Sequence, residues 1–485
     1  MAAESDEAQP KETSRKHDGR TADALVEFMS RDWGEPPALR GRHPAREHHA
    51  RRRAAISAAF PGRPLVVPAG TLKVRANDTD YRFRPGSDFF WLCGHDEPDS
   101  VLVLHPQSDT HRAVLYVEPR ADRSTSAFFT NARSGELWVG PRRGVAEAAA
   151  HLDIETAPIG RLEDDLEGLN APLVVRDVDA ELDAAIPAND DDNTLATALS
   201  ELRLVKDDFE VQQLQVAVNA TIHAFEDVVR ALPEAMEQGE RVIEGVFNLR
   251  ARVEGNDVGY GTIAASGSHA TILHWTRNDG EVRSGELLLL DAGVECNQLY
   301  TADVTRTLPV NGRFTSTQRR LYDMVLRAQR AGIAAVKPGA EFLDPHRAAM
   351  RVLAEGLDEL GLLPCSVEES LRDDRQLHRR YTLHGTSHML GLDVHDCAHA
   401  REQEYRGGTL RPGNVLTVEP GLYFQANDLT VPEELRGIGI RIEDDVLVTE
   451  HGCRVLSGAL PTDADDIERW MASLRDGNPE LRQPL

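Results

Sequence analysis

Two aspartates stand at points in the sequence where an unpaired carboxylate would be costly. Asp291 ends a run of four leucines with the pattern of a buried strand, and Asp303 follows a turn in a segment rich in β-branched residues. Burying an ionised carboxylate costs free energy unless it is paired or bound to a metal ion. An antiparallel hairpin would bring the two side chains together, so we interpret them as partners in one site.

A cluster of histidines follows later in the chain. His384, His388 and His395 fall within twelve residues, among glycines and alternating apolar positions. Imidazoles at such spacing are candidate metal ligands and proton carriers. No glutamate follows His384, so the helical zinc signature HExxH is absent.

Two glutamates complete the set, each on a strand pattern. Alternation places Thr417 and Glu419 on one strand face, and it places Gly439, Arg441 and Glu443 on one face of a second strand. A glycine beside a carboxylate leaves room for a group to approach the backbone.

Together these segments supply four carboxylates and one histidine, an oxygen-rich ligand set that suits Mn²⁺ or a similar divalent ion. Two such ions about 3.5 Å apart can share a hydroxide and polarise a carbonyl group, which is the chemistry of metal-assisted hydrolysis. Each residue has a structural alternative: Asp291 could cap a turn, His388 could be a core histidine, and Glu443 could be a surface residue. The conjunction of four segments favours a functional site.

The elements that must position these residues form two domains. A chain of 485 residues exceeds one ordinary core. We expect an extended or disordered tail at 1–44, without regular elements to about 35, a mixed α/β domain without catalytic residues at 45–205, and a catalytic domain at 206–485. Strand patterns are expected at 64–67, 101–104, 113–117 and 172–175, and helices at 45–60, 145–152, 207–232, 316–336 and 345–360.

Composition limits the partners and the compartment. The net charge of −26 disfavours nucleic acid as a partner. The basic segment 40–53 is interpreted as the solvated face of a helix. Five scattered cysteines without a CxxC pair favour a reducing compartment, and no run approaches the roughly 20 apolar residues of a membrane span. We therefore expect a cytoplasmic protein without a membrane partner.

The motifs resemble those of the pita-bread metallopeptidases, most closely aminopeptidase P (Xaa-Pro aminopeptidase). The matching strings are 272–275 (ILHW), the Asp291/Asp303 hairpin, 384–396, 417–423 and 437–445, and the string at 87–94 resembles the creatinase-type N-terminal domain of that family. The resemblance implies an α/β (α+β) protein with a C-terminal pita-bread domain. It also implies peptide substrates with proline at the second position, two divalent ions, expected to be Mn²⁺, and a homodimer or homotetramer.

The resemblance assigns roles residue by residue. It implies five metal ligands, of which the second and last bridge both ions: Asp291, Asp303, His388, Glu419 and Glu443. It gives Glu419 the proton of the attacking hydroxide, makes His274, His384 and His395 the histidines that hold the substrate and stabilise the tetrahedral intermediate, and makes Arg441 a substrate contact. Asp291 and Asp303 are twelve positions apart, where eleven is the commoner spacing of the family. We therefore expect a longer turn or a bulge between Glu295 and Tyr300.

Three alternatives stay open. A prolidase has the same fold and metal site but cleaves only Xaa-Pro dipeptides, and the strings ILHW and GIGIRIEDD favour aminopeptidase P over it. A creatinase-like amidinohydrolase lacks the metal ligands. A non-catalytic metal-binding scaffold would be expected to have lost ligands, and this chain keeps all five.

Overall fold

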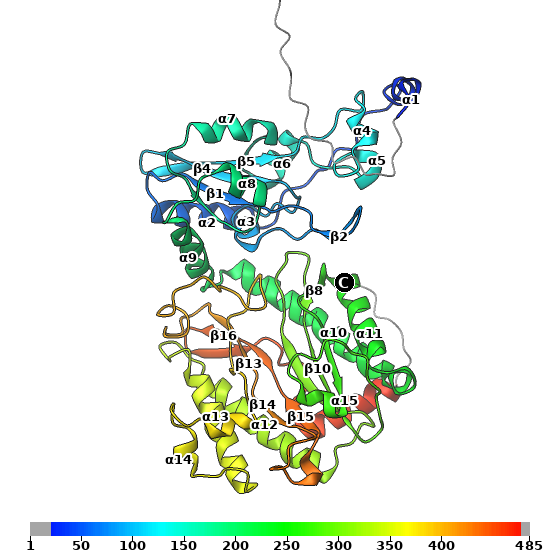
Figure 1. Ribbon diagram of the computed structural model, residues 1–485, viewed down its shortest axis with the longest axis vertical. Helices are drawn as coiled ribbons and strands as arrows, with labels where there is room; N and C mark the ends of the chain where they lie inside the picture. Colours follow the sequence, from blue (N-terminus) through cyan, green and yellow to red (C-terminus); the bar gives the residue numbers. More distant parts are fainter. Residues whose placement is uncertain (1–20, 477–485) are drawn as a thin grey trace, which may run out of the picture. The chain divides into compact units, whose positions relative to one another are not determined.

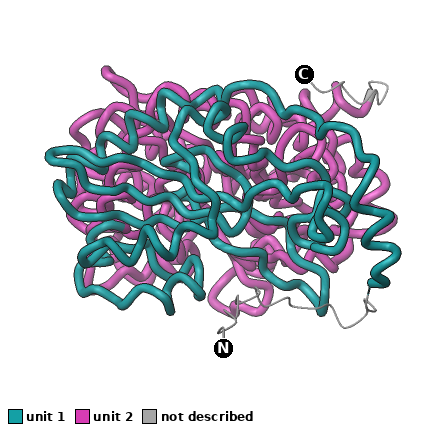
Figure 2. The backbone as a smooth tube through the Cα atoms, turned by 90° about the horizontal axis from the view of Figure 1, so that it is seen from above, with its two compact units in different colours: residues 1–195 teal, residues 196–485 magenta. Residues whose placement is uncertain are grey.

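The computed structural model describes residues 21–476, and the chain divides after Leu195 into two compact units (Figure 2). The division falls inside helix α9 (Asp192–Arg203), and the expected boundary at 205 lies just beyond the end of this helix. Each unit has its own hydrophobic core, so each is described separately.

The N-terminal unit is built on a five-stranded sheet in the order β6-β5-β4-β1-β7 (Figure 1). Neighbouring strands β1, β4 and β5 pair antiparallel, whereas the outer strands β7 and β6 pair parallel to β1 and β5. Apolar side chains such as Val66, Val103, Val114 and Val174 form a buried core. The strands are β1 (Leu65–Pro68), β4 (Val101–Gln107), β5 (Thr110–Val117), β6 (Glu155–Pro158) and β7 (Leu173–Val174), with a separate small ribbon of β2 (Val74–Ala76) and β3 (Thr79–Asp80).

The helices of this unit agree in part with the expected pattern. Helix α6 (Val145–Leu152) has the predicted bounds, and α2 (Arg46–Ala59) lies within one residue of them at each end. The other helices are α3 (Ser87–Cys93), α4 (Ala127–Thr130), α5 (Glu136–Val139), α7 (Leu162–Glu167) and α8 (Ala180–Ala185).

Two expectations for the start of the chain differ from the structure. A short helix, α1 (Asp23–Met29), occupies part of the stretch for which no element was expected, whereas residues 1–20 lie outside the described residues. The interpretation of the basic segment as a solvated face is wrong for Arg52 and Arg53. Both are buried in α2, where they donate to the carbonyl oxygens of Trp91 at 3.2 Å and Leu92 at 2.8 Å.

Long helices surround the sheets of the C-terminal unit. Helix α10 begins with a capping box, because the Asp207 carboxylate accepts from the Glu210 N–H while the Glu210 side chain accepts from the Asp207 N–H. Thr315 and Gln318 cap α12 in the same way. The helices are α10 (Asp208–Gln238), α11 (Glu240–Glu254), α12 (Ser316–Ala335), α13 (Asp344–Glu359), α14 (Val367–Ser370) and α15 (Ala464–Asp476).

Several small antiparallel sheets carry the residues of interest. They are ordered β12-β10-β9, β14-β15, β13-β16-β17 and β11-β8. Their strands are β8 (Asp257–Val258), β9 (Ile263–Ser266), β10 (Leu287–Ala292), β11 (Val294–Glu295), β12 (Val304–Pro309), β13 (Val415–Val418), β14 (Gly421–Phe424), β15 (Ile438–Arg441), β16 (Asp444–Thr449) and β17 (Gly452–Val455).

The β10–β12 hairpin explains how Asp291 and Asp303 share a face despite their spacing. Asp291 lies opposite Thr305, and the bridge between Glu295 and Thr301 continues the same register toward the turn. Asp303 is two positions from Thr305 and therefore on the same side as Asp291. The additional length is taken up by a wider turn, in which Leu299 adopts a φ of +62°, and the register is unbroken.

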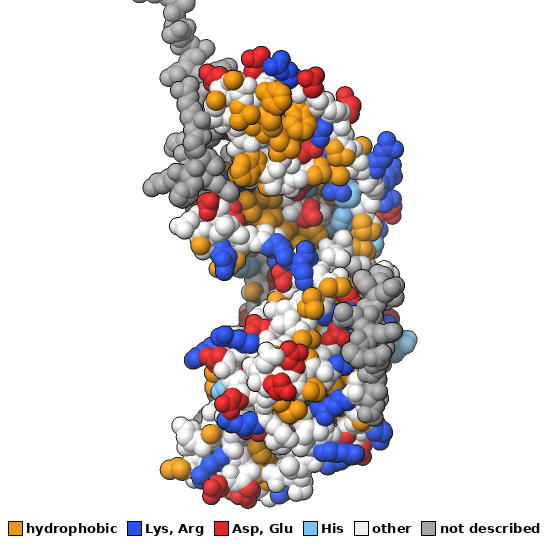
Figure 3. Space-filling model, turned by 90° about the vertical axis from the view of Figure 1, so that its right-hand side faces the viewer, with side chains coloured by type: hydrophobic (Ala, Val, Ile, Leu, Met, Phe, Trp, Pro, Cys, Tyr) orange, Lys and Arg blue, Asp and Glu red, His pale blue; other side chains and the backbone are white. Residues whose placement is uncertain are grey.

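The surface of the N-terminal unit includes an apolar area. Figure 3 shows hydrophobic side chains gathered on one face of this unit. Its exposed large apolar residues include Phe28 of α1 and Leu137, Trp138 and Val139 of α5. Between residues 21 and 476, no helix combines the length and the apolar character that a membrane span requires.

Candidate metal centre and active site

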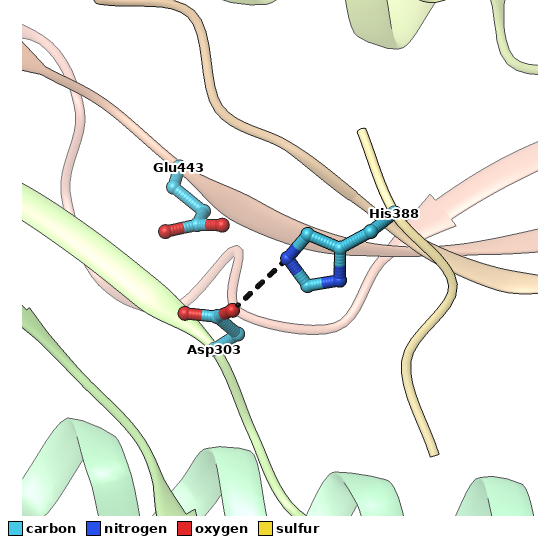
Figure 4. Close-up of side chains that lie close together, drawn as sticks. All are labelled: Asp303, His388 and Glu443. Atoms are coloured by element: carbon cyan, nitrogen blue, oxygen red, sulfur yellow. Dashed lines mark ion pairs between the residues drawn. The ribbon is translucent and has the colours of Figure 1, made fainter. Parts of the chain in front are cut away.

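Three side chains from separate segments meet in the C-terminal unit. Asp303, His388 and Glu443 each offer one ligand atom, and these atoms all lie within 4.8 Å of one another. The three side chains point toward a common space (Figure 4), where Asp303 Oδ2 lies 3.2 Å from His388 Nε2. Asp303 and Glu443 are 5% and 1% exposed, so this is a buried acidic centre.

Strand pairing fixes the position of Glu443. Its N–H donates to the Thr305 carbonyl at 3.1 Å, and the Thr305 hydroxyl donates to Glu443 Oε2 at 2.6 Å. The buried Arg306 guanidinium donates to the Glu443 carbonyl at 2.6 Å and pairs with Asp444 at 2.7 Å. The backbone around Glu443 is thus held on both sides by β12.

Pairing with β13 fixes His388 and Glu419. The Thr417 N–H donates to the His388 carbonyl at 3.0 Å, and the Glu419 N–H donates to the Thr386 carbonyl at 2.8 Å. His388 Nε2 lies 3.7 Å from Glu419 Oε1, and His384 Nδ1 lies 3.5 Å from Glu419 Oε2. Glu419 therefore lies between the two histidines.

Asp291 belongs to the same centre through other contacts. The Tyr260 hydroxyl is 2.7 Å from Asp291 Oδ1 and also makes a short hydrogen bond to Asp303. Arg441 pairs with Asp291 at 2.5 Å and donates to the Tyr423 hydroxyl at 2.9 Å.

The predicted substrate-binding residues line the same region. His384 Nε2 is 2.7 Å from the Tyr423 hydroxyl. The His395 ring packs edge-on against His388, with ring centroids 4.5 Å apart. His274 is exposed and lies near enough to His384 and His395 to interact electrostatically with both.

Burial and like charge dominate the electrostatics of the protein groups. Burial, followed by the charges of Asp303 and Glu419, raises the pKa of Glu443 well above its usual value. Burial also raises the pKa of Glu419 to about 8, against the opposing charge of His388. Burial alone would lower the pKa of His388, but its hydrogen bond to Asp303 and the nearby carboxylates raise it to about 9.

This donor set fits divalent cations. Buried Glu443 Oε1 has no hydrogen-bond partner among the residues that the structure describes. Buried carboxylates normally receive protein donors or coordinate a metal. The carboxylates and the imidazole here are ligands for hard or borderline divalent ions. Bound cations would supply positive charge to balance these buried carboxylates.

Two further residues of the centre, Tyr260 and Asp445, were not predicted from the sequence to have a role in the site. Tyr260 lies between Gly259 and Gly261 and joins Asp291 to Asp303; the flanking glycines were a signal of close backbone approach. Asp445 is fully buried and accepts from the Asp303 N–H at 3.2 Å.

The buried centre fits a metal-dependent hydrolase, and comparison with known proteins identifies the family. Residues 212–450 match metallopeptidase family M24, and residues 49–173 match the aminopeptidase P N-terminal domain. The chain is 54% identical over 460 residues to Xaa-Pro aminopeptidase 1 of Streptomyces coelicolor, covering 94% of this chain and 93% of the relative. It is 35% identical over 455 residues to Xaa-Pro aminopeptidase of Escherichia coli, covering 88% and 98%.

Solved structures agree with this result. Pseudomonas aeruginosa aminopeptidase PepP superposes with a TM-score of 0.79 at 32% identity, covering 90% of this chain and 100% of that one. Aminopeptidase P from E. coli with the inhibitor Pro-Leu gives a TM-score of 0.78 at 31% identity, with coverage of 90% and 100%.

The chain therefore belongs to metallopeptidase family M24, with an aminopeptidase P-type N-terminal domain. The predicted fold class is confirmed, as is the activity class of a metallo-aminopeptidase, a peptidase hydrolase.

Proposed function

We propose that this metallo-aminopeptidase removes the N-terminal residue of peptides that carry proline at the second position. The observation that carries the proposal is the buried centre of Asp303, His388 and Glu443, in which Glu443 Oε1 has no hydrogen-bond partner among the described residues, in a chain 54% identical to an Xaa-Pro aminopeptidase. The centre supports metal-assisted hydrolysis, and the similarity to Xaa-Pro aminopeptidases supports peptides with proline at the second position as substrates.

We assign the binding of two divalent ions, with Mn²⁺ as the expected metal, to five side chains: Asp291, Asp303, His388, Glu419 and Glu443. When bound, such ions lower the pKa of water and polarise a carbonyl group. Asp303 and Glu443, which immediately precede β12 and β16 and lie close to each other, would hold the ions together with His388.

The protein groups around these ligands handle the proton and the substrate. Glu419, between His384 and His388, accepts the proton of the attacking water and delivers it to the leaving proline nitrogen. Burial lowers the pKa of His384 to about 3, and burial also lowers the pKa of His395. Both are neutral at pH 7. In this form His395 offers a ring N–H to the scissile carbonyl oxygen, whereas His384 donates its Nδ1–H to the Gly385 carbonyl at 2.7 Å and accepts from the Tyr423 hydroxyl at Nε2.

Two other residues complete the substrate site. His274 is exposed beside these histidines and contributes a further substrate contact. Arg441, held by Asp291 and Tyr423, orients the Tyr423 hydroxyl toward His384 and supplies positive charge at the edge of the centre.

Metal analysis combined with hydrolysis of an Xaa-Pro dipeptide and an Xaa-Pro-Xaa tripeptide tests the proposal. We expect two bound ions per chain, loss of activity after chelation, best recovery with Mn²⁺, and cleavage of the tripeptide before proline. Cleavage of the dipeptide alone would identify a prolidase. Bound metal without turnover of either peptide would identify a non-catalytic scaffold, and full activity in a metal-free sample would overturn the metal assignment.

We also propose a homodimer or homotetramer in the cytoplasm, on the grounds of the family resemblance and of the scattered cysteines, which carry no disulfide among residues 21–476. Light scattering of the purified protein and cell fractionation test these two points. A monomer at micromolar concentration, or recovery outside the cytoplasmic fraction, would contradict them.

A further inference from the structure

A second buried charge cluster lies behind the segment that carries His388 and His395. Asp396 is 1% exposed; one of its carboxylate oxygens accepts from Lys206 Nζ at 2.8 Å, and the other accepts from Arg203. The Lys206 side chain is fully buried, and its ammonium also donates to the Arg203 carbonyl at 2.7 Å. We call Arg203, Lys206 and Asp396 the basic clasp.

Asp396 closes the loop between the two histidines. Its N–H donates to the Met389 carbonyl at 3.0 Å, and the Gly391 N–H donates to the Asp393 carbonyl at 3.1 Å. The residue before Asp396 is His395 and the residue before Met389 is His388, so this closure brings the two imidazoles together. Their ring centroids lie 4.5 Å apart at an interplanar angle of 80°.

The loop backbone rests directly on the clasp. A Cβ atom at Gly391 would lie 2.9 Å from Lys206 Cε and would collide with the Asp396 carboxylate. Only glycine leaves the space for this approach. Lys206 and Asp396 therefore pack against the loop at Gly391, which lies between His388 and His395 in the sequence.

The other side of the clasp is anchored to residues 413–414, which lead into β13. The Lys206 N–H donates to the Gly413 carbonyl at 2.9 Å, and Asn414 Nδ2 donates to the Leu204 carbonyl at 2.7 Å. Asp207, the next residue, caps α10. Burial alone would raise the pKa of Asp396, but the charges of Arg203 and Lys206 hold this pKa well below its usual value. The Asp396 carboxylate is therefore ionised at neutral pH.

We propose that the basic clasp is a positioning device for catalysis, in which Asp396, fixed by Lys206 and Arg203, sets the loop so that the His395 imidazole faces the reacting carbonyl. The inference rests on the proposed function, which gives His395 its role. His388 is additionally restrained by β13, whereas His395 depends on the loop. A displacement of about 1 Å in a reacting group can reduce the rate about 10²-fold.

The test removes one charge of the clasp at nearly constant side-chain volume, in Asp396→Asn and in Lys206→Met. We expect each variant to keep its metal content and its KM within about threefold and to lose about 10- to 100-fold in kcat, because the interaction of His395 is made in the transition state. The matched control is Asp227→Asn. It removes one carboxylate partner of Arg250, which is 4% exposed and donates to Asp227 at 2.6 Å and to Glu254 at 2.9 Å in the α10–α11 contact of the same unit. The control should lower the melting temperature but leave kcat within about twofold.

A double-mutant cycle separates positioning from general stability. In a His395→Ala background, Asp396→Asn should cost less than about threefold in kcat, since the group that the clasp positions is already absent. An equal loss in both backgrounds would overturn the inference. If Asp396→Asn fails to fold, Lys206→Met carries the same cycle.

A spectroscopic measurement reads the clasp independently of turnover. In NMR spectra of protein isotopically labelled at the histidine rings, the His395 ring signal is assigned by its loss in His395→Ala. This signal should shift or broaden in both clasp variants and stay unchanged in Asp227→Asn. An unchanged His395 signal in the clasp variants would overturn the inference. Altered signals in a protein that cleaves no Xaa-Pro peptide would overturn the proposed function while supporting the clasp.

Discussion

Glu240 and Glu443 are both buried glutamates of the catalytic unit, but the protein treats them differently. Glu240 is 0% exposed and accepts from four donors, two on each oxygen: the Ser266 N–H and His269 Nδ1 on one, and Trp275 Nε1 and the Gly280 N–H on the other. Glu443 is 1% exposed and accepts from the Thr305 hydroxyl on one oxygen, while the other is without a partner among the described residues.

The difference lies in what the protein supplies. The surroundings of Glu240 provide every hydrogen bond that a carboxylate accepts, so its burial serves the fold. The surroundings of Glu443 add further carboxylates, Asp303 and Glu419, where donors would be expected. A folded chain keeps such an arrangement when the missing positive charge comes from outside, and burial alone therefore does not distinguish a structural carboxylate from a ligand. The number of protein donors does.

The largest expected effect is that of Glu443→Gln. The substitution removes a proposed metal ligand, so we expect loss of metal and a fall in kcat/KM of at least about 10³-fold. It also removes one charge from a group of like charges, so the metal-free variant should melt at the same temperature as the metal-free wild type or higher. Metal analysis, kinetics and calorimetry check these points, and full metal content would remove Glu443 from the ligand set.

His395→Ala should have the next largest effect. A donor directed at a developing oxyanion contributes about 10²–10³ in rate, so turnover should fall by at least about tenfold with both metals retained. A near-normal melting temperature distinguishes this role from that of a core histidine. If metal is lost in step with activity, His395 supports the ligands and its catalytic role should be dropped.

The metal-free protein should lose stability as pH rises. The pKa of Glu419 is raised to about 8 by burial, and that of His388 to about 9 by Asp303 against the effect of burial. Both shifts make the folded protein bind more protons than the unfolded chain, so the free energy of unfolding falls as pH rises from about 4.5 through 9. Added Mn²⁺ should flatten this dependence, because it holds the ligands in their deprotonated forms. Melting temperatures measured across this range, with metal and with chelator, provide the check, and identical profiles would contradict the assignment.

Local patterns predicted much of the fold, and with it the side of each strand that carries the candidate residues. Helix α6 has the bounds that its local pattern predicted, and Arg441 and Glu443, for which alternation predicted one face, both contact the Thr305 hydroxyl. The burial of Arg52 could not be predicted in this way, because its partner, the Trp91 carbonyl, comes from a distant segment. The same holds for Tyr260, whose two carboxylate partners lie 31 and 43 residues further along the chain. Spacing indicates which face a residue takes, whereas tertiary packing decides which donors meet it.

The smallest expected effect is that of Glu240→Gln, and it tests the structural side of the comparison. One oxygen becomes an amide NH₂ group, so two of the four donors face a donor and lose their partner. Leaving buried donors unpaired costs about 1–3 kcal/mol each, so the melting temperature should fall by several degrees. Because these donors hold both ends of the 266–280 segment that carries His274, we expect KM to rise about two- to tenfold with kcat and metal content little changed. Calorimetry, metal analysis and steady-state kinetics on an Xaa-Pro-Xaa tripeptide measure the three quantities. Loss of metal without loss of stability would place Glu240 among the metal ligands. It would also contradict the distinction between a buried carboxylate that the protein supplies with donors and one that binds a cation.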